Sequence, residues 1–212
     1  MAEWGLSKGE LQALKRLDTP IKIQDYLDRL PMNWEKRGET QMSPRRVLKE
    51  RKAHCVEGAL LAAAALWVAG ERPLIMDLYA QEGVGDVDHV VALYKRNGYW
   101  GAISKTNHPS IRFRDPVYRT LRELALSYFH EWFMNSNGKK TLESYARPLN
   151  LATLGTSWLS SEQDLWHIND KLNDLPHYNL RPKANERYIR RADPVELKAG
   201  RIEEWPYSNP RT

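Results

Sequence analysis

The sequence has a single cysteine, Cys55, among its 212 residues. One thiol excludes an internal disulfide and any zinc or iron–sulfur site that needs several cysteine ligands. Long hydrophobic runs are also absent, since the longest, residues 59–69, is shorter than the roughly 18 residues that span a membrane. The N-terminal residues Met1–Trp4 have neither the basic nor the apolar stretch of a secretory signal. We therefore expect a cytoplasmic protein with a reduced thiol and no membrane partner.

The excess of positive charge is small. The 32 Lys and Arg residues oppose 27 Asp and Glu residues, which gives a formal net charge of +5. Basic clusters occur at residues 45–46, 49–52 and 187–191. Nucleic-acid binding requires basic side chains gathered on one face, and the sequence does not show this. We interpret the clusters as solvated surface and do not predict a nucleic-acid partner.

A metal site also lacks support. His54 and Cys55 are adjacent, so on a helix their side chains diverge by about 100°. His89 and His108 lie on different segments, and no pair of histidines has the His-x-x-x-His spacing. We predict no metal and no cofactor.

Helical patterns fill the first part of the chain. Apolar residues recur at helical spacing over residues 1–30, and residues 19–20, a Thr-Pro pair, divide this stretch into two helices. Residues 43–44, a Ser-Pro pair, are typical of a helix start. Residues 55–69 are apolar nearly all round and end at Gly70, which predicts a buried helix with a glycine C-cap.

Three strands are predicted next, over residues 73–80, 89–96 and 99–104. The last two flank Asn97-Gly98, the strongest short-range signal for a hairpin. A two-residue turn there pairs residues whose numbers sum to 195.

The C-terminal half is less regular. Helical patterns predict helices over residues 120–133 and 161–175, and the chain from residue 176 is rich in proline and charge. We predict one α+β domain over residues 1–180, followed by an extended basic tail over residues 181–212 that packs on the domain or leaves it.

Cys55 is a candidate nucleophile because it begins the most apolar helix. The first amides of a helix point outward without partners, and the helix dipole is positive there. Both effects stabilise a thiolate, and the same amides could hold an oxyanion. The alternative is that Cys55 is a small buried hydrophobe.

His89 is the candidate base. It begins the second strand, and the hairpin register places Thr106 opposite it and Ser104 diagonally beside it on the same face. This order provides a nucleophile, a base and a residue that orients the base. The alternative is a histidine at the sheet rim that only satisfies its own hydrogen bonds.

Three short motifs resemble the core of the transglutaminase-like superfamily of papain-type thiol enzymes: residues 53–59 (AHCVEGA), 88–91 (DHVV) and 98–100 (GYW). The resemblance covers residues 20–107. It implies a Cys-bearing helix packed on a small antiparallel sheet, with further helices N- and C-terminal to this core. It also implies Cys55 and His89 as catalytic residues, no cofactor, and a peptide or protein amide as substrate, cleaved by hydrolysis or transamidation.

The third catalytic position departs from this family. Ser104 occupies the place where such enzymes usually carry Asp or Asn. A serine can accept a hydrogen bond from an imidazole but offers no full negative charge. Asn107 could supply an amide, and Asp86 or Asp88 a charge, although strict alternation turns Asp88 to the opposite face. The third role stays open.

Candidates for a second oxyanion donor, or for a pocket wall that faces the substrate, are Asn33, Trp34 and Gln41. Asp88 is a further candidate for contact with the substrate. Their alternatives are turn or capping roles for Asn33 and Gln41, and packing for Trp34.

The leading hypothesis is a cysteine-dependent hydrolase or acyltransferase that acts on an amide or ester carbonyl. The alternative is an inactive transglutaminase-like module that binds a peptide or protein partner.

Overall fold

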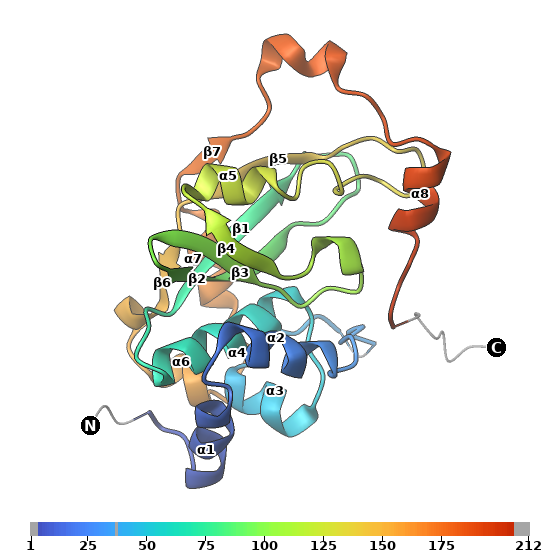
Figure 1. Cartoon of the computed structure of the whole chain (residues 1–212). Coiled ribbons are helices and arrows are strands. Elements are labelled where there is room, and N and C mark those ends of the chain that lie inside the picture. The colour runs from blue at the N-terminus through green and yellow to red at the C-terminus, as the bar shows by residue number, and fades with distance from the viewer. Residues whose placement is uncertain (1–3, 37, 206–212) are drawn as a thin grey trace, which may run out of the picture.

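The computed structural model describes residues 4–36 and 38–205, and over these ranges the chain has an α+β fold built on one antiparallel sheet (Figure 1). The strands described are β1 (Leu74–Ala80), β2 (His89–Arg96), β3 (Tyr99–Ile103), β4 (Arg114–Tyr118), β5 (Leu142–Ala146), β6 (Leu149–Asn150) and β7 (His177–Asn179). Their order across the sheet is β4-β3-β2-β1-β5-β7, and the short β6 pairs with β1 beside β5.

Helices lie on both faces of the sheet, most of them on one face (Figure 1). The helices described are α1 (Lys8–Arg16), α2 (Pro20–Asp28), α3 (Pro44–Glu50), α4 (Cys55–Val68), α5 (Leu121–Leu126), α6 (Ser157–Ser160), α7 (Trp166–Asn173) and α8 (Pro194–Gly200). The first three begin at side-chain caps, because Ser7, Thr19 and Ser43 each accept a hydrogen bond from a first-turn amide.

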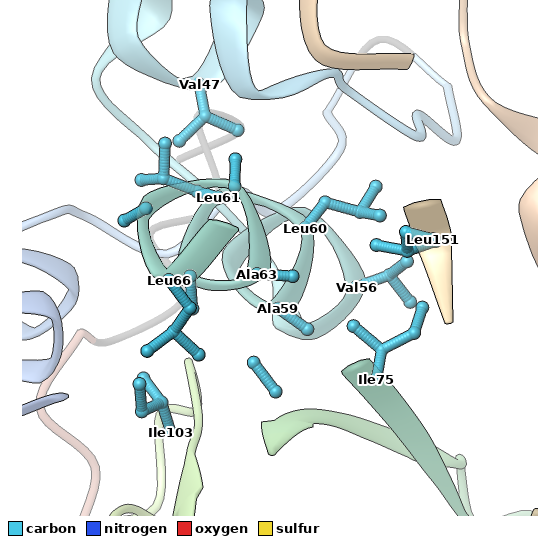
Figure 2. Close-up of a cluster of buried hydrophobic side chains, with 14 of the residues drawn as sticks. Val47, Val56, Ala59, Leu60, Leu61, Ala63, Leu66, Ile75, Ile103 and Leu151 are labelled. Carbon is cyan, nitrogen blue, oxygen red and sulfur yellow. The ribbon is translucent and has the colours of Figure 1, made fainter. Parts of the chain in front are cut away.

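Helix α4 is the centre of the larger apolar cluster. Its residues 59–66 are at most 1% exposed, because α1, α2 and α3 pack on one side of it and β1 and β2 on the other. Figure 2 shows Leu61 beside Val47 of α3, and Val56 beside Ile75 of β1. This surrounding explains why α4 is apolar on every side, as the sequence predicts.

The opposite face of the sheet carries a second apolar cluster. Met76 and Leu78 of β1 pack there with Leu124 and Tyr128, from α5 and the turn that follows it. Side chains alternate along β1, so Ile75 faces α4 instead. Both faces of the sheet are therefore covered, and the N-terminus of α4 lies against the sheet.

The predicted hairpin register is confirmed. Ala92 pairs with Ile103, and Arg96 pairs with Tyr99, so both pairs sum to 195. Asn97 has φ 51° and Gly98 has φ 90°, which are the positive values that a tight two-residue turn requires.

The second half of the chain differs from the sequence prediction. Helix α5 ends at Leu126 rather than at residue 133, because the following aromatic residues pack against the sheet in turns. The helix predicted from residue 161 begins at Trp166. The carboxylate of Asp164 accepts hydrogen bonds from the Gln41 amide at 2.8 Å and from Arg46 at 2.7 Å, which holds the chain outside the helix.

The tail predicted over residues 181–212 packs on the domain in its described part, and it contains a helix instead of only extended chain. Just before this segment, β7 pairs with β5. Within it, α8 begins at Pro194, and its N-cap Asp193 accepts hydrogen bonds from two backbone amides of the first turn. This is an ordinary N-cap signal in a stretch with few aliphatic residues. Residues 206–212 of the predicted tail, and residues 1–3 of the predicted N-terminal helix, lie outside the described residues. In the part that is described, no helix is long and apolar enough to cross a membrane.

Candidate active site

Cys55 is the first residue of α4, and it lines a pocket of about 380 Å³. The thiol is partly buried and lies near two imidazoles, those of His54 and His89. Burial alone would raise the pKa of Cys55, but hydrogen bonding and electrostatic attraction to these two rings hold the pKa well below its usual range. The thiol therefore has the electrostatic surroundings of a reactive cysteine.

His89 begins β2 and is only 6% exposed. Its Nε2 lies 2.5 Å from Oγ of Ser104, the residue that follows β3. Oγ of Ser104 is also 3.4 Å from the carbonyl oxygen of Ile111. Because a carbonyl only accepts, the hydroxyl donates to Ile111 and accepts from Nε2–H of His89. This tautomer leaves Nδ1 of His89 without a hydrogen, as acceptance of the proton of the nearby Cys55 thiol requires.

Gln24 of α2 holds Ser104 in place. Its side-chain nitrogen donates to the Ser104 carbonyl at 2.9 Å, and its oxygen accepts from the Ser104 amide at 3.0 Å. Two bonds to one backbone unit fix the position from which the hydroxyl reaches His89. Sequence reasoning missed Gln24, although a glutamine on the apolar face between Ile23 and Leu27 is the signal of a buried polar contact.

Asn107, the other candidate for orienting His89, binds the C-terminal segment instead. Its Oδ1 accepts from the Trp205 amide at 2.7 Å, and its carbonyl accepts from the Glu204 amide at 3.2 Å. Asn107 lines the pocket but anchors residues 204–205 there. The acceptor for Nε2–H of His89 is Oγ of Ser104.

The two candidate aspartates do not bind His89 directly. Asp88 is on the pocket rim, and its Oδ1 accepts from the Ala80 amide at 2.8 Å. Asp86 accepts from Nε1 of Trp132 at 3.0 Å, and the Trp132 ring meets the His89 ring edge-on with centroids 6.0 Å apart. Sequence reasoning missed this role of Trp132 because it placed residues 129–133 on a helix.

The upstream candidates separate into one wall residue and two structural residues. Among the described residues, the pocket wall includes Trp34 but neither Asn33 nor Gln41. Asn33 donates to the Glu57 carboxylate at 3.1 Å, and the Gln41 amide donates to Asp164. The Asn33 side chain therefore supports the start of α4 through Glu57, whereas Gln41 contacts Asp164 through its backbone N–H alone.

Lys105 forms part of the pocket wall next to Ser104. The side chain is fully buried, and Nζ donates to the Leu30 carbonyl at 2.5 Å. Burial lowers the pKa of Lys105 to about 8. A Cβ at Gly58 of α4 would lie 2.4 Å from Cβ of Lys105, so the glycine allows this strand end to approach the helix.

No model of a known protein family matches the chain, and no curated protein matches it either. Within residues 4–36 and 38–205, no group of three or more His, Cys, Asp or Glu side chains could hold a metal ion. The chemistry of the pocket must therefore be argued from its own side chains.

Proposed function

We propose that this protein is a cysteine-dependent hydrolase or acyltransferase that acts on an amide or ester carbonyl. The observation that carries the proposal is the contact of 2.5 Å between Nε2 of His89 and Oγ of Ser104. His89 lines the same pocket as Cys55, whose thiol has a lowered pKa. A nucleophile, a base and a group that orients the base are the parts that acyl transfer by a thiol requires.

The reaction proceeds in two halves. The Cys55 thiolate attacks the carbonyl carbon, and the resulting oxyanion is held by backbone amides at the start of α4. His89, which has taken the proton of the Cys55 thiol, gives this proton to the leaving amine or alcohol as the bond between that group and carbon breaks, which leaves a thioester on Cys55. Water or an amine then attacks the thioester, His89 takes the proton of this nucleophile, and the carbon–sulfur bond breaks to release the thiolate.

The substrate class rests on the resemblance to the transglutaminase-like superfamily, which favours peptide or protein amides. Ser104 supports a second candidate function, because a neutral hydroxyl stabilises an imidazolium less than a carboxylate does. In that function the same pocket, with Trp34 in its wall, binds a peptide or protein partner without turnover.

The test is turnover of an activated ester, p-nitrophenyl acetate, by the purified chain. Cys55→Ala is expected to abolish turnover and the acetyl adduct seen by mass spectrometry. His89→Ala is expected to lower turnover about 100- to 10,000-fold, the usual contribution of general acid–base catalysis. His167→Ala, which changes an exposed histidine on α7, is the control and should keep wild-type turnover.

Two results would overturn the enzyme proposal. One is a wild-type thiol that reacts with iodoacetamide near pH 6 no faster than a free cysteine. The other is a reactive thiol that never releases product from an ester or a peptide, which favours the inactive binding module.

A further inference from the structure

A second imidazole, that of His54, lies beside Cys55, and the buried carboxylate of Glu57 on α4 lies next to this ring. Glu57 is 0% exposed. It accepts hydrogen bonds from Oγ1 of Thr40 at 2.8 Å, the His54 amide at 2.9 Å, and the Met42 amide and Asn33 side chain, each at 3.1 Å. Four neutral donors satisfy the oxygens but bring no charge. A buried carboxylate is further stabilised by a cation close to it.

His54 supplies this cation. Its Nε2 lies 3.4 Å from Oε1 of Glu57 and 2.8 Å from the carbonyl oxygen of Thr40. Because the carbonyl only accepts, Nε2 carries a hydrogen. A second carboxylate, that of Glu35, lies 3.7 Å from the same nitrogen. Two carboxylates and a carbonyl on one side of the ring all favour the imidazolium.

The other nitrogen of His54 faces the nucleophile. Its Nδ1 lies 4.0 Å from Sγ of Cys55. Side chains of adjacent helical residues would diverge, but His54 is the N-cap, with extended backbone angles of φ −98° and ψ −171°. Burial alone would lower the pKa of His54, but the hydrogen bond and charge of Cys55, the charge of Glu57 and the Thr40 carbonyl raise it to about 9.

We propose that His54, held by Glu57, is the permanent counter-ion of the Cys55 thiolate, and that His89 serves mainly to transfer protons to and from the acyl group. The part assigned to His89 rests on the proposed function. The part assigned to His54 concerns the charge of the thiol and is measurable without any substrate.

The other ionisable groups around the pair are His89 and Asp88 on the β2 side, Asp77 on β1, and Glu35 and Glu57 on the far side of the His54 ring. Burial, with the nearby charges of Asp88 and Cys55, raises the pKa of Asp77 to about 8. At pH 7 Asp77 is therefore mostly protonated and adds little negative charge near the sulfur.

The experiment is the pH profile of iodoacetamide alkylation of Cys55 between pH 4 and 9. His54→Asn keeps a residue that caps helices well but cannot be charged. We expect it to shift the midpoint of the alkylation profile to higher pH by at least about one unit. His89→Ala should keep a thiol pKa below that of free cysteine while it loses ester turnover, and His167→Asn should leave the profile unchanged.

An unchanged profile in His54→Asn would overturn the proposal, as would an ordinary thiol pKa in His89→Ala with His54 intact. A wild-type thiol with an ordinary pKa would remove the proposed function as well, so the two failures are distinct. The wild-type protein supplies a second measurement that needs no variant. Nitrogen-15 NMR of its imidazoles should show both His54 nitrogens protonated at pH 7, and a neutral His54 ring there would contradict the proposal.

Discussion

Ser104→Ala removes the one oxygen that Nε2 of His89 contacts at 2.5 Å. The change leaves the backbone of residue 104 bound to Gln24 through its amide and its carbonyl. We therefore expect the strand end to stay in place and the loss to be confined to the imidazole. The His89 ring would then lose the bond that fixes both its tautomer and its orientation toward Cys55.

The size of the effect follows from burial. Ser104 is 0% exposed, and an N–H left without a partner in such a place costs about 1–3 kcal/mol. If this energy is lost only when the ring must be oriented for proton transfer, turnover falls roughly 10- to 100-fold, since about 1.4 kcal/mol corresponds to tenfold in rate.

The assay is steady-state turnover of p-nitrophenyl acetate, with thermal unfolding measured on the same samples. Ser144→Ala is the matched control, because Ser144 is a buried serine on β5 that is not in the wall of the Cys55 pocket as far as the structure describes it. Its turnover should equal that of the wild type. Wild-type turnover in a folded Ser104→Ala protein would refute the role of Ser104 as the orienting group.

Two further predictions concern stability. Gly58→Ala should destabilise the fold by about 1–2 kcal/mol in urea unfolding, because the new Cβ would lie 2.4 Å from Cβ of the buried Lys105 and overpacking outweighs the gain in helix propensity. Gly9→Ala on α1, where nothing lies within 4 Å of the new Cβ, should instead be neutral or stabilising, and equal effects of the two changes would contradict the argument. Burial raises the pKa of Asp77 to about 8, so the folded state keeps a proton that the unfolded state loses near pH 4, and wild-type stability should fall from pH 4 to pH 8. Asp77→Asn removes this dependence, so its stability relative to wild type should rise over that range by roughly 2–5 kcal/mol, and a constant difference across the range would show that Asp77 is not protonated in the fold.

The sequence by itself determined the features that depend on neighbouring residues. The Ser43-Pro44 pair predicts a helix start because a cap acts within its own first turn. Asn97-Gly98 fixes the register of β2 and β3, since a two-residue turn leaves only one pairing. That register is why a contact between His89 and the residue diagonally across the hairpin could be predicted.

The short strands of the second half could not be found in the same way. Strands β6 and β7 have two and three residues, which is too few for an alternating pattern to stand out. These strands exist because longer neighbours offer them hydrogen bonds: β7 pairs with β5, and β6 with β1. Their formation is a property of the assembled sheet.

The partners that complete the pocket were likewise decided by the tertiary structure. Gln24 meets Ser104 from 80 positions away, and the Trp205 amide meets Asn107 from 98 positions away. A side chain's hydrogen-bond partner depends on which distant segment folds against it, and a local sequence pattern does not predict that segment. Even His54, next to Cys55 in sequence, faces the sulfur only because the N-cap backbone is extended and Glu57 and Thr40 lie around its ring.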